Sequence, residues 1–375
     1  MDYELSKPQK MLQQSVREFC GRQCTADHVR EIMETETAHH AELWQGVADQ
    51  GWIGLHLPEE HGGLGLGLVD LAVVFEEVGR ACLPGPFLSS TWAATLISKT
   101  GHAASVSSIL PELCEGSKIG TVACFEEEAG WVSGQYDAVK AEVSGDGLTL
   151  SGKKQLVADA AVADVFVVAA RGEQGLTLVL VESSANGINI TPTEGLDATR
   201  KLYEVTFDIV NVSADNVMST GADAERALKE SQQVGMVAVC AELVGSMQWM
   251  LEECVEYAKT RKQFDKIIGS FQAIQHKCAD ILLTTESSRS AMLYAAWALS
   301  EGTDDAERAV SIAKLFCSDA GQKVGGLAIQ VHGGIGFTWE HDLHLFYKRN
   351  KSNEFLFGDA TFHRELVARL ALDAA

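Results

Sequence analysis

The clearest candidates for chemistry are an arginine and a glycine pair in the last third of the chain. Arg261 stands at the end of one long apolar stretch, and Gly333-Gly334 ends another. A dinucleotide cofactor needs a guanidinium or backbone donors for its pyrophosphate, and a tight backbone that lets the cofactor approach. These residues therefore favour a dinucleotide site. The alternatives are that Arg261 is a solvated charge at a helix end and that Gly333-Gly334 only terminates a helix.

Charge and cysteine content restrict the function further. The formal net charge is −22, whereas binding to nucleic acid or to an anionic membrane needs the opposite sign. We therefore expect neither partner. The nine cysteines form no CxxC pair and show no metal-ligand spacing, so no metal site is expected. No signal segment and no membrane-spanning apolar run is recognised, and the simplest expectation is a cytoplasmic protein with reduced thiols.

An anionic ligand on such an acidic chain needs local cations. Near the C-terminus these are Lys348, Arg349, Lys351 and Arg364. They are placed to meet the phosphates of a cofactor or substrate, but ion pairs with nearby carboxylates are the simpler interpretation.

Long helices are expected to position the arginine and the glycines. All six prolines lie within the first 192 residues. Beyond them, apolar residues recur at three-and-four spacing over 223–257, 271–300 and 304–334, and a short last helix is expected over 359–372. Packed side by side, these segments predict an antiparallel four-helix bundle.

The middle third of the chain predicts strands instead. Short β-rich segments separated by turn residues recur from 120 to 209 and indicate a small barrel or sandwich. Residues 1–117 return to helical periodicity. We therefore predict an α+β multidomain protein, with an N-terminal helical domain over 1–117, a middle β domain over 118–220 and a C-terminal bundle over 221–375.

Three segments carry a resemblance to a known family. They are GWIGL at 51–55 with PEEHGGLG at 58–65, RKQF at 261–264 with IGSFQAIQH at 268–276, and QVHGGIGF at 330–337. In order and spacing, and over essentially the whole chain, they resemble the acyl-CoA dehydrogenases, which are flavin-dependent. Each motif alone is weak, because glycine-rich tripeptides have many uses, but jointly they are specific.

The resemblance implies FAD as cofactor and assigns roles to particular residues. In the family, the residues matching Arg261, Phe264 and Gln272 hold the ADP half of FAD from a neighbouring subunit. Those matching Gln330 and Gly333-Gly334 complete that pocket. The resemblance therefore implies a homo-oligomer, a dimer or more often a homotetramer.

The segments that normally contact the flavin ring depart from the family pattern. A segment usually like ALTEPxAGSD reads ACFEEEAGW from residue 123, so Phe125 replaces the hydroxyl that normally contacts the ring. A second segment usually like WITN reads LVAD from residue 156, so leucine replaces the shielding tryptophan and Ala158 replaces the threonine. Phe125 and Ala158 are the expected ring contacts, with little side-chain support for the ring.

The catalytic base is the most ambiguous residue. Most members place a glutamate before Gly-Thr near the C-terminus, and counting forward from Gly334 without a gap puts Phe357 there. A two-residue insertion brings Asp359 into that position. An aspartate that follows a glycine and opens the last helix is equally suited to be its N-cap. Some members instead use a glutamate on the first helix of the C-terminal bundle, but that position is Gly235 here, which has no carboxylate to act as base.

These residues predict an FAD-containing acyl-CoA dehydrogenase. It would oxidise an acyl-CoA substrate to the 2,3-enoyl-CoA, with Asp359 as base and an electron-transfer flavoprotein as acceptor. The alternative is a heteromer with a second acyl-CoA dehydrogenase subunit, in which this chain supplies cofactor contacts but no base. A catalytically silent CoA-ester-binding protein is a third possibility.

Overall fold

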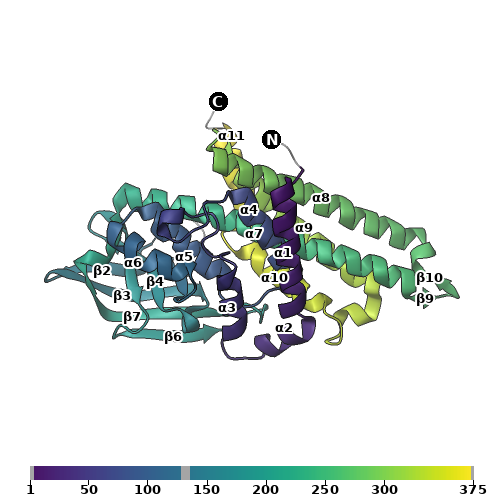
Figure 1. Cartoon of the computed structure of the whole chain (residues 1–375), viewed down its shortest axis with the longest axis horizontal. Helices are drawn as coiled ribbons and strands as arrows, with labels where there is room; N and C mark the ends of the chain where they lie inside the picture. The colour runs from purple at the N-terminus through teal and green to yellow at the C-terminus, as the bar shows by residue number, and fades with distance from the viewer. Residues whose placement is uncertain (1–3, 128–135, 373–375) are drawn as a thin grey trace. The chain divides into compact units, whose positions relative to one another are not determined.

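The computed structural model describes residues 4–127 and 136–372 (Figure 1). By its contacts the chain divides into two compact units. The first, here called the helical unit, comprises Met1–Arg30, Leu68–Leu83 and Met236–Ala375, and the second, the β unit, comprises Glu31–Gly67 and Pro84–Gly235. The N-terminal third therefore contributes to both units. Helix α7 (Gly221–Thr260) begins in the β unit and continues in the helical unit.

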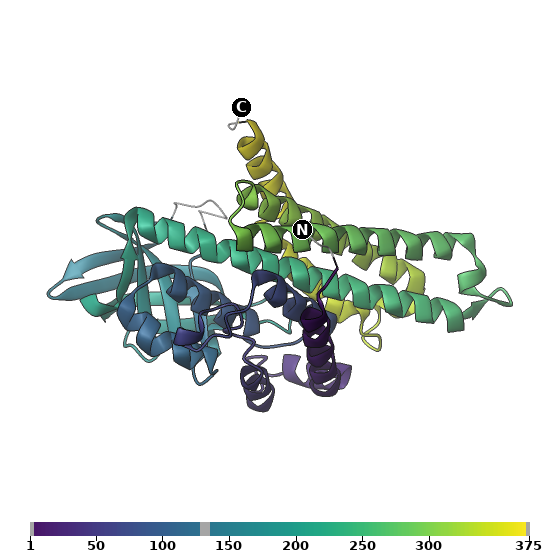
Figure 2. The ribbon, with the colours of Figure 1, turned by 45° about the horizontal axis from the view of Figure 1, so that its top comes forward.

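Long helices build the helical unit. With most of α7 it contains α1 (Lys7–Gln23), α4 (Leu68–Arg80), α8 (Gln272–Glu301), α9 (Ala306–His332), α10 (Leu343–Phe355) and α11 (Ala360–Leu372). Helix α9 packs against α8, α10 and α11. Its buried residues include Val310, Cys317 and Val324, which recur at helical spacing. Figures 1 and 2 both show α7 and α8 running alongside each other and meeting at a small hairpin formed by β9 (Lys262–Gln263) and β10 (Lys266–Ile267).

Helices α4 and α7 cross at two glycines. A Cβ on Gly79 would lie 2.1 Å from the carbonyl oxygen of Glu242, and a Cβ on Gly245 would lie 1.7 Å from that of Glu76. Any larger residue at either position would push the two backbones apart.

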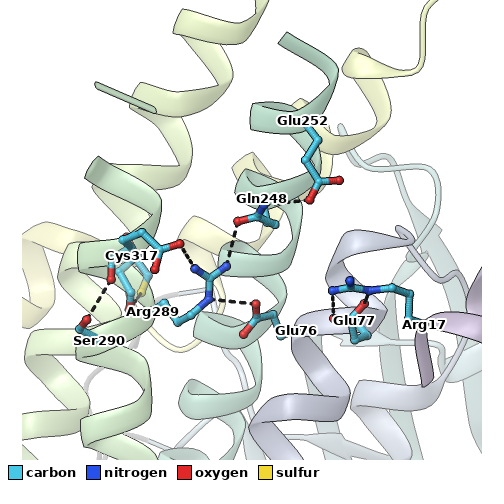
Figure 3. Close-up of polar contacts among 10 residues, drawn as sticks. Arg17, Glu76, Glu77, Gln248, Glu252, Arg289, Ser290 and Cys317 are labelled. Carbon is cyan, nitrogen blue, oxygen red and sulfur yellow. Dashed lines mark hydrogen bonds and ion pairs between the residues drawn. The ribbon is translucent and has the colours of Figure 1, made fainter. Parts of the chain in front are cut away.

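Charged side chains join the helices around this crossing (Figure 3). Arg17 of α1 donates two hydrogen bonds to Glu77 of α4, at 2.7 and 2.9 Å. Arg289 of α8 donates to Glu76 of α4 and to Gln248 of α7, both at 3.0 Å. Burial raises the pKa of Glu76, and Arg289 opposes that effect. Each of these buried carboxylates has a guanidinium partner, as an uncompensated buried charge would be costly.

The β unit is built on one sheet. Its strands are β1 (Gly120–Ala123), β2 (Val139–Ser144), β3 (Gly147–Ala158), β4 (Val165–Gly172), β5 (Gly175–Glu182), β6 (Ile188–Thr193), β7 (Leu202–Ser213) and β8 (Val217–Thr220). They pair in the order β6-β7-β3-β2-β4-β5-β8, and β1 pairs with β4 in parallel. Strands β4 and β5 are almost continuously buried, as expected for strands covered on both faces.

Helices from the N-terminal third complete the β unit. They are α3 (Ala41–Asp49), α5 (Phe87–Thr100) and α6 (Ala103–Cys114), while α2 (Ala26–Met33) spans the boundary between the units. Helix α5 packs on β1 and is buried along nearly its whole length.

The helical–β–helical order predicted from sequence is confirmed, whereas the domain limits at 118 and 221 remain predictions. The helices expected over 223–257, 271–300, 304–334 and 359–372 correspond to α7, α8, α9 and α11, and the expected strands to β1–β7. Strand β8 and helix α10 were not predicted. Helix α10 lacks an apolar stripe because Arg349, Asn350 and Asn353 are among its buried residues.

Helix α7 contains a long apolar stretch that the sequence analysis did not recognise. It contains an 18-residue stretch of mean hydropathy 1.5, long and apolar enough to cross a bilayer by length and composition. However, 83% of that stretch is buried inside the structure, which is typical of a core helix.

Candidate functional site

The first predicted cofactor motif lies at the turn between α7 and α8 (Figure 1). Arg261 follows the last residue of α7, and β9 (Lys262–Gln263) and β10 (Lys266–Ile267) then form a hairpin. Phe264 lies at its tip with a φ of 54° and a side chain that is 86% exposed. Gln272 is the first residue of α8 and is also exposed. Phe264 therefore presents an exposed aromatic ring on a backbone conformation that a bulky residue rarely adopts.

The second predicted motif lies at the same end of the helical unit. Tyr257, near the end of α7, stacks on His332, the last residue of α9, with ring centroids 4.5 Å apart. Gln330, Gly333 and Gly334 are exposed around that helix end. A Cβ on either glycine would meet nothing within 4 Å, so the backbone there is open to a ligand. The fold therefore brings together two motifs that lie far apart in the sequence.

Positive charge gathers at this end of an otherwise acidic chain. Over residues 257–277 the single carboxylate Asp265 stands among Arg261, Lys262, Lys266 and Lys277, while Lys259 pairs with Glu256 at 2.6 Å. Within residues 4–127 and 136–372, nothing pairs with the side chain of Arg261. An unpaired guanidinium beside open glycine backbone fits the pyrophosphate of FAD, so the residues predicted for the ADP half fit the cofactor.

The residues predicted for the flavin ring, Phe125 and Ala158, both lie in the β unit, and Phe125 lines a pocket of about 550 Å³. Phe125 and Leu156 line this pocket together with charged and amide side chains, and none of its described lining residues carries a hydroxyl. Ala158 is half-buried and does not line it; its carbonyl accepts a hydrogen bond from Thr121 at 2.7 Å. Residues 128–131, which belong to the same predicted segment as Phe125, lie outside the described residues.

Phe125 is held by an aromatic neighbour. Its ring lies 5.9 Å from that of Trp92, centroid to centroid, and the indole nitrogen of Trp92 donates to the hydroxyl of Ser231 at 3.2 Å. Only 9% of Phe125 is exposed. The position that offers a hydroxyl to the flavin in the family is therefore filled by packed aromatic rings.

Several polar groups in and next to the pocket are engaged with one another. Glu204 accepts hydrogen bonds from Lys153 at 3.1 Å and from Gln155 at 2.5 Å, and these bonds lower the pKa of Glu204. Nearby, Lys154 and Glu126 form an ion pair in which both side chains are almost fully buried. Burial lowers the pKa of Lys154, and Glu126 opposes that effect. These groups hold one another in place rather than standing free for a ligand.

Asp359 is the N-cap of α11. Its Oδ1 accepts a hydrogen bond from the backbone N–H of Phe362 at 2.8 Å, which confirms the capping interpretation. The side chain is half-buried. The role of Asp359 as a base stays a prediction.

The turn before Asp359 is strained and firmly held. Phe357 and Gly358 have φ values of 60° and 100°, a region that a bulky residue such as phenylalanine rarely adopts. Lys314 donates to the carbonyl oxygens of Glu354 and Gly358, at 2.9 and 2.8 Å, and His363 donates to that of Phe357 at 2.9 Å. Lys314 and His363 are fully buried, and burial lowers their pKa values to about 8 and about 4. Phe357, which falls at the usual base position when the chain is counted from Gly334 without a gap, is 3% exposed and offers no carboxylate.

The C-terminal cations contact protein groups, as the simpler interpretation predicted. Arg349 donates to the carbonyl of Leu83, Lys351 pairs with Glu354, Arg364 pairs with Asp319, and Lys348 lies over the ring of Trp339. They are therefore not a free phosphate-binding cluster.

The two buried lysines were missed by sequence reasoning, although one left a signal. Lys314 lies on α9 between the buried residues Val310 and Cys317, at helical spacing from both. A lysine on an apolar stripe is seldom fully buried without a specific partner. Lys154, between Lys153 and Gln155 on β3, gave no such signal because the neighbouring side chains are also polar.

Family models match the chain along nearly its whole length. The N-terminal, middle and C-terminal domain models of the acyl-CoA dehydrogenases match residues 6–117, 122–210 and 226–372. Among curated proteins, the chain is 31% identical to the acyl-CoA dehydrogenase IpdE2 of Mycolicibacterium smegmatis, over 98% of both chains.

Two similar solved structures are named as two-component proteins. The chain is 28% identical, with a TM-score of 0.90, to a chain of the ChsE4-ChsE5 complex of Mycobacterium tuberculosis, covering 99% of both chains. It is 30% identical, with a TM-score of 0.88, to a chain of the Tcur3481-Tcur3483 steroid ACAD, covering 98% of both chains.

Proposed function

The chain belongs to the acyl-CoA dehydrogenase family, and we propose that it is the subunit of a heteromeric member that supplies ADP-half contacts to FAD while a second subunit supplies the catalytic base. As a family member it is an FAD-dependent oxidoreductase acting on CH–CH bonds. When bound, FAD would supply the hydride acceptor for the oxidation of an acyl-CoA, and Arg261 with Gly333-Gly334 would hold its ADP half.

The main support for the proposal is the difference between the residues predicted to bind the ADP half of FAD and those predicted to contact its flavin ring. The ADP-half residues are exposed, surrounded by cations and gathered at one end of the helical unit. The ring-half residues are apolar, and Phe125 is packed against Trp92. A chain with this contrast can bind the ADP half of an FAD while another subunit binds the flavin ring of the same FAD.

The C-terminal turn supports a base supplied from elsewhere. Counted from Gly334 without a gap, Phe357 falls at the usual base position, and one oxygen of the Asp359 carboxylate accepts the capping hydrogen bond of α11. The likeness to chains of two-component proteins, at 28 and 30% identity, agrees with a heteromer.

Flavin content tests the proposal directly. We expect the chain purified alone to be colourless, and the tagged chain purified from its native host to carry FAD together with a second acyl-CoA dehydrogenase polypeptide. Anaerobic addition of an acyl-CoA should bleach the flavin of the assembly. A chain that is yellow by itself, and is bleached by an acyl-CoA without a second polypeptide, would refute the proposal.

The second candidate is a self-sufficient dehydrogenase with Asp359 as base and an electron-transfer flavoprotein as electron acceptor. One observation favours it: Lys314 and His363 hold the strained turn directly before Asp359, and strain is often kept where a residue must be positioned. The cap uses Oδ1 only, so Oδ2 stays available for a proton. The experiment on the isolated chain separates the two candidates.

For the substrate we propose a ring-bearing acyl-CoA, because the similar Tcur3481-Tcur3483 protein is described as a steroid ACAD. Anaerobic bleaching with a panel of short-chain, long-chain and steroid-side-chain CoA esters tests this. Faster bleaching by butyryl-CoA than by the steroid ester would refute this substrate class and leave the proposed subunit role intact.

A further inference from the structure

Lys314 of α9 is a fully buried lysine that contacts the turn between α10 and α11. Its ammonium donates to the hydroxyl of Ser318 at 2.8 Å and to the carbonyl oxygens of Glu354 and Gly358 at 2.9 and 2.8 Å. An ammonium has three N–H donors, so these three bonds use all of them. All three acceptors are uncharged oxygens, and directed hydrogen bonds therefore offset the cost of burying the charge.

The end of helix α10 also stabilises this ammonium. Glu354 is the penultimate residue of α10, and the last four carbonyl groups of a helix have no partner within the helix. Lys314 supplies a partner for the Glu354 carbonyl and places a positive charge at the helix C-terminus, where the helix dipole favours a cation. The carboxylate of Glu354 pairs with another cation, Lys351, at 2.8 Å. Lys314 is therefore bound at the point where α10 passes into the turn.

Two successive peptide groups before Asp359 are fixed by buried donors. Lys314 binds the carbonyl of Gly358, and Nε2 of the fully buried His363 donates to the carbonyl of Phe357 at 2.9 Å. Each peptide group is planar and the backbone has only two soft dihedrals per residue. Fixing these two carbonyl directions therefore restricts the position of the next Cα, which belongs to Asp359.

The turn keeps its conformation only while these donors hold it. Gly358 has a φ of 100°, and a Cβ there would lie 2.5 Å from Cδ1 of Phe362 and 3.1 Å from Nε2 of His363. Phe357 has a φ of 60°, which is unfavourable for a bulky residue. Without the hydrogen bonds to its carbonyl groups, the chain is expected to relax at Phe357 and to shift Asp359.

The side chain of Asp359 is restricted as well. Its Oδ1 accepts the capping hydrogen bond from the backbone N–H of Phe362 at 2.8 Å, which leaves Oδ2 to accept a proton. The backbone of Asp359 is thus fixed from α9 and α11, and its carboxylate is fixed by the helix that it opens. A general base needs this precision, because it must lie within hydrogen-bond reach of the proton that it removes.

We propose that Lys314 and His363 are positioning residues for Asp359, which hold its carboxylate in the place that a general base needs. The inference rests on the second candidate function, in which Asp359 is the base. Neither residue touches the substrate. Both act through the carbonyl groups of the turn, Lys314 from α9 and His363 from α11.

The test uses the FAD-containing protein purified from its native host through a tag on this chain. Its anaerobic flavin reduction is followed by stopped flow at pH 7, with a steroid-side-chain CoA ester and with butyryl-CoA. We expect Lys314→Met to lower the limiting rate at least about 10-fold, with the FAD content and the half-saturating ester concentration unchanged. Hydrogen exchange followed by mass spectrometry should be at least about 10-fold faster over residues 355–363 and unchanged over α8.

Two control variants separate positioning from a general loss of packing. Lys323→Met is the same substitution at an exposed lysine of α9, which donates to Thr284 of α8 at 3.4 Å and not to the turn. Ser318→Ala removes the third acceptor of Lys314 and leaves both carbonyl bonds in place. Both variants should keep the wild-type rate and the wild-type exchange over residues 355–363.

His363 gives an independent test that does not depend on the folding of Lys314→Met. The amide nitrogen of glutamine can replace Nε2 as a donor, whereas phenylalanine keeps a ring without a donor. His363→Gln should therefore retain most of the rate, and His363→Phe should lose at least about 10-fold. Equal rates in these two variants would contradict a role for the hydrogen bond to Phe357.

Asp359→Asn distinguishes failure of the inference from failure of the function on which it rests. If Asp359→Asn loses about 100-fold in rate while Lys314→Met keeps the wild-type rate, the positioning role is wrong and Asp359 remains the base. If Asp359→Asn keeps the wild-type rate, the second candidate function is wrong, and the positioning role falls with it. Loss of rate in both variants, with FAD retained, supports the inference.

Discussion

Two adjacent lysines on β3 should differ greatly in what they contribute to stability. The side chain of Lys154 is fully buried, and the carboxylate of its partner Glu126 is 4% exposed. The side chain of Lys153 is 55% exposed and that of its partner Glu204 is 27% exposed. The chemistry of the two pairs is the same, so burial alone distinguishes them.

The magnitudes follow from that burial. Lys154→Met keeps the length of the side chain but, among the described residues, leaves Glu126 buried with only the backbone N–H of Ala138, which donates to it at 2.9 Å. Removing one partner of a buried ion pair costs about 3–5 kcal/mol. Lys153→Met removes an exposed pair, for which about 0.2–1 kcal/mol is usual.

Urea unfolding of both variants at pH 7, followed by circular dichroism, measures the difference. We expect Lys154→Met to lower the unfolding midpoint strongly at an unchanged slope, and Lys153→Met to shift it slightly. Adding Glu126→Gln to Lys154→Met should recover much of the loss, because the orphaned charge is removed. If Lys154→Met cost no more than Lys153→Met, the reasoning from burial would be refuted.

Three further predictions address the cofactor, the turn and the buried lysine of α9. Arg261→Ala should weaken FAD binding to the assembly by about 1.5–3 kcal/mol, measured by fluorescence titration; unchanged affinity would remove Arg261 from the site. Asp359→Asn should leave both the melting temperature and the rate of anaerobic flavin reduction nearly unchanged if Asp359 only caps α11, and Asp359→Ala should cost about 1 kcal/mol of stability. A loss of about 100-fold in flavin reduction for Asp359→Asn would instead establish it as the base. Burial lowers the pKa of Lys314 from 10.5 to about 8, so the unfolded chain binds more protons between these values and unfolding free energy should rise with pH there. The gain attributable to Lys314 is up to about 3 kcal/mol. Lys314→Met should lack that gain in urea titrations at pH 7.5 and 10, and an equal pH dependence in both proteins would contradict it.

The sequence alone determined the order of the structural layers and the family. Helical and strand periodicities are local properties of the chain, so the positions of α7, α8 and α9 and of strands β1–β7 were readable without contacts. The motifs predicted to bind the cofactor are recognisable for the same reason, because their residue types and spacing are properties of short segments. Helix α10 was not predicted because its buried residues include Arg349 and Asn353. Its sequence therefore shows no apolar stripe that would identify the face turned toward the core.

The tertiary structure alone decided what these residues can do. Packing of α7 beside α9, seen in the stacking of Tyr257 on His332, places the arginine and glycine motifs at one end of the helical unit. Sequence spacing could not choose between cap and base for Asp359, because both need a carboxylate after a glycine. The hydrogen bond from the backbone of Phe362 establishes the cap. Two apolar cavities of about 390 and 500 Å³ lie between α7 and α8 and exist only once these helices are paired, since residues of both helices line them.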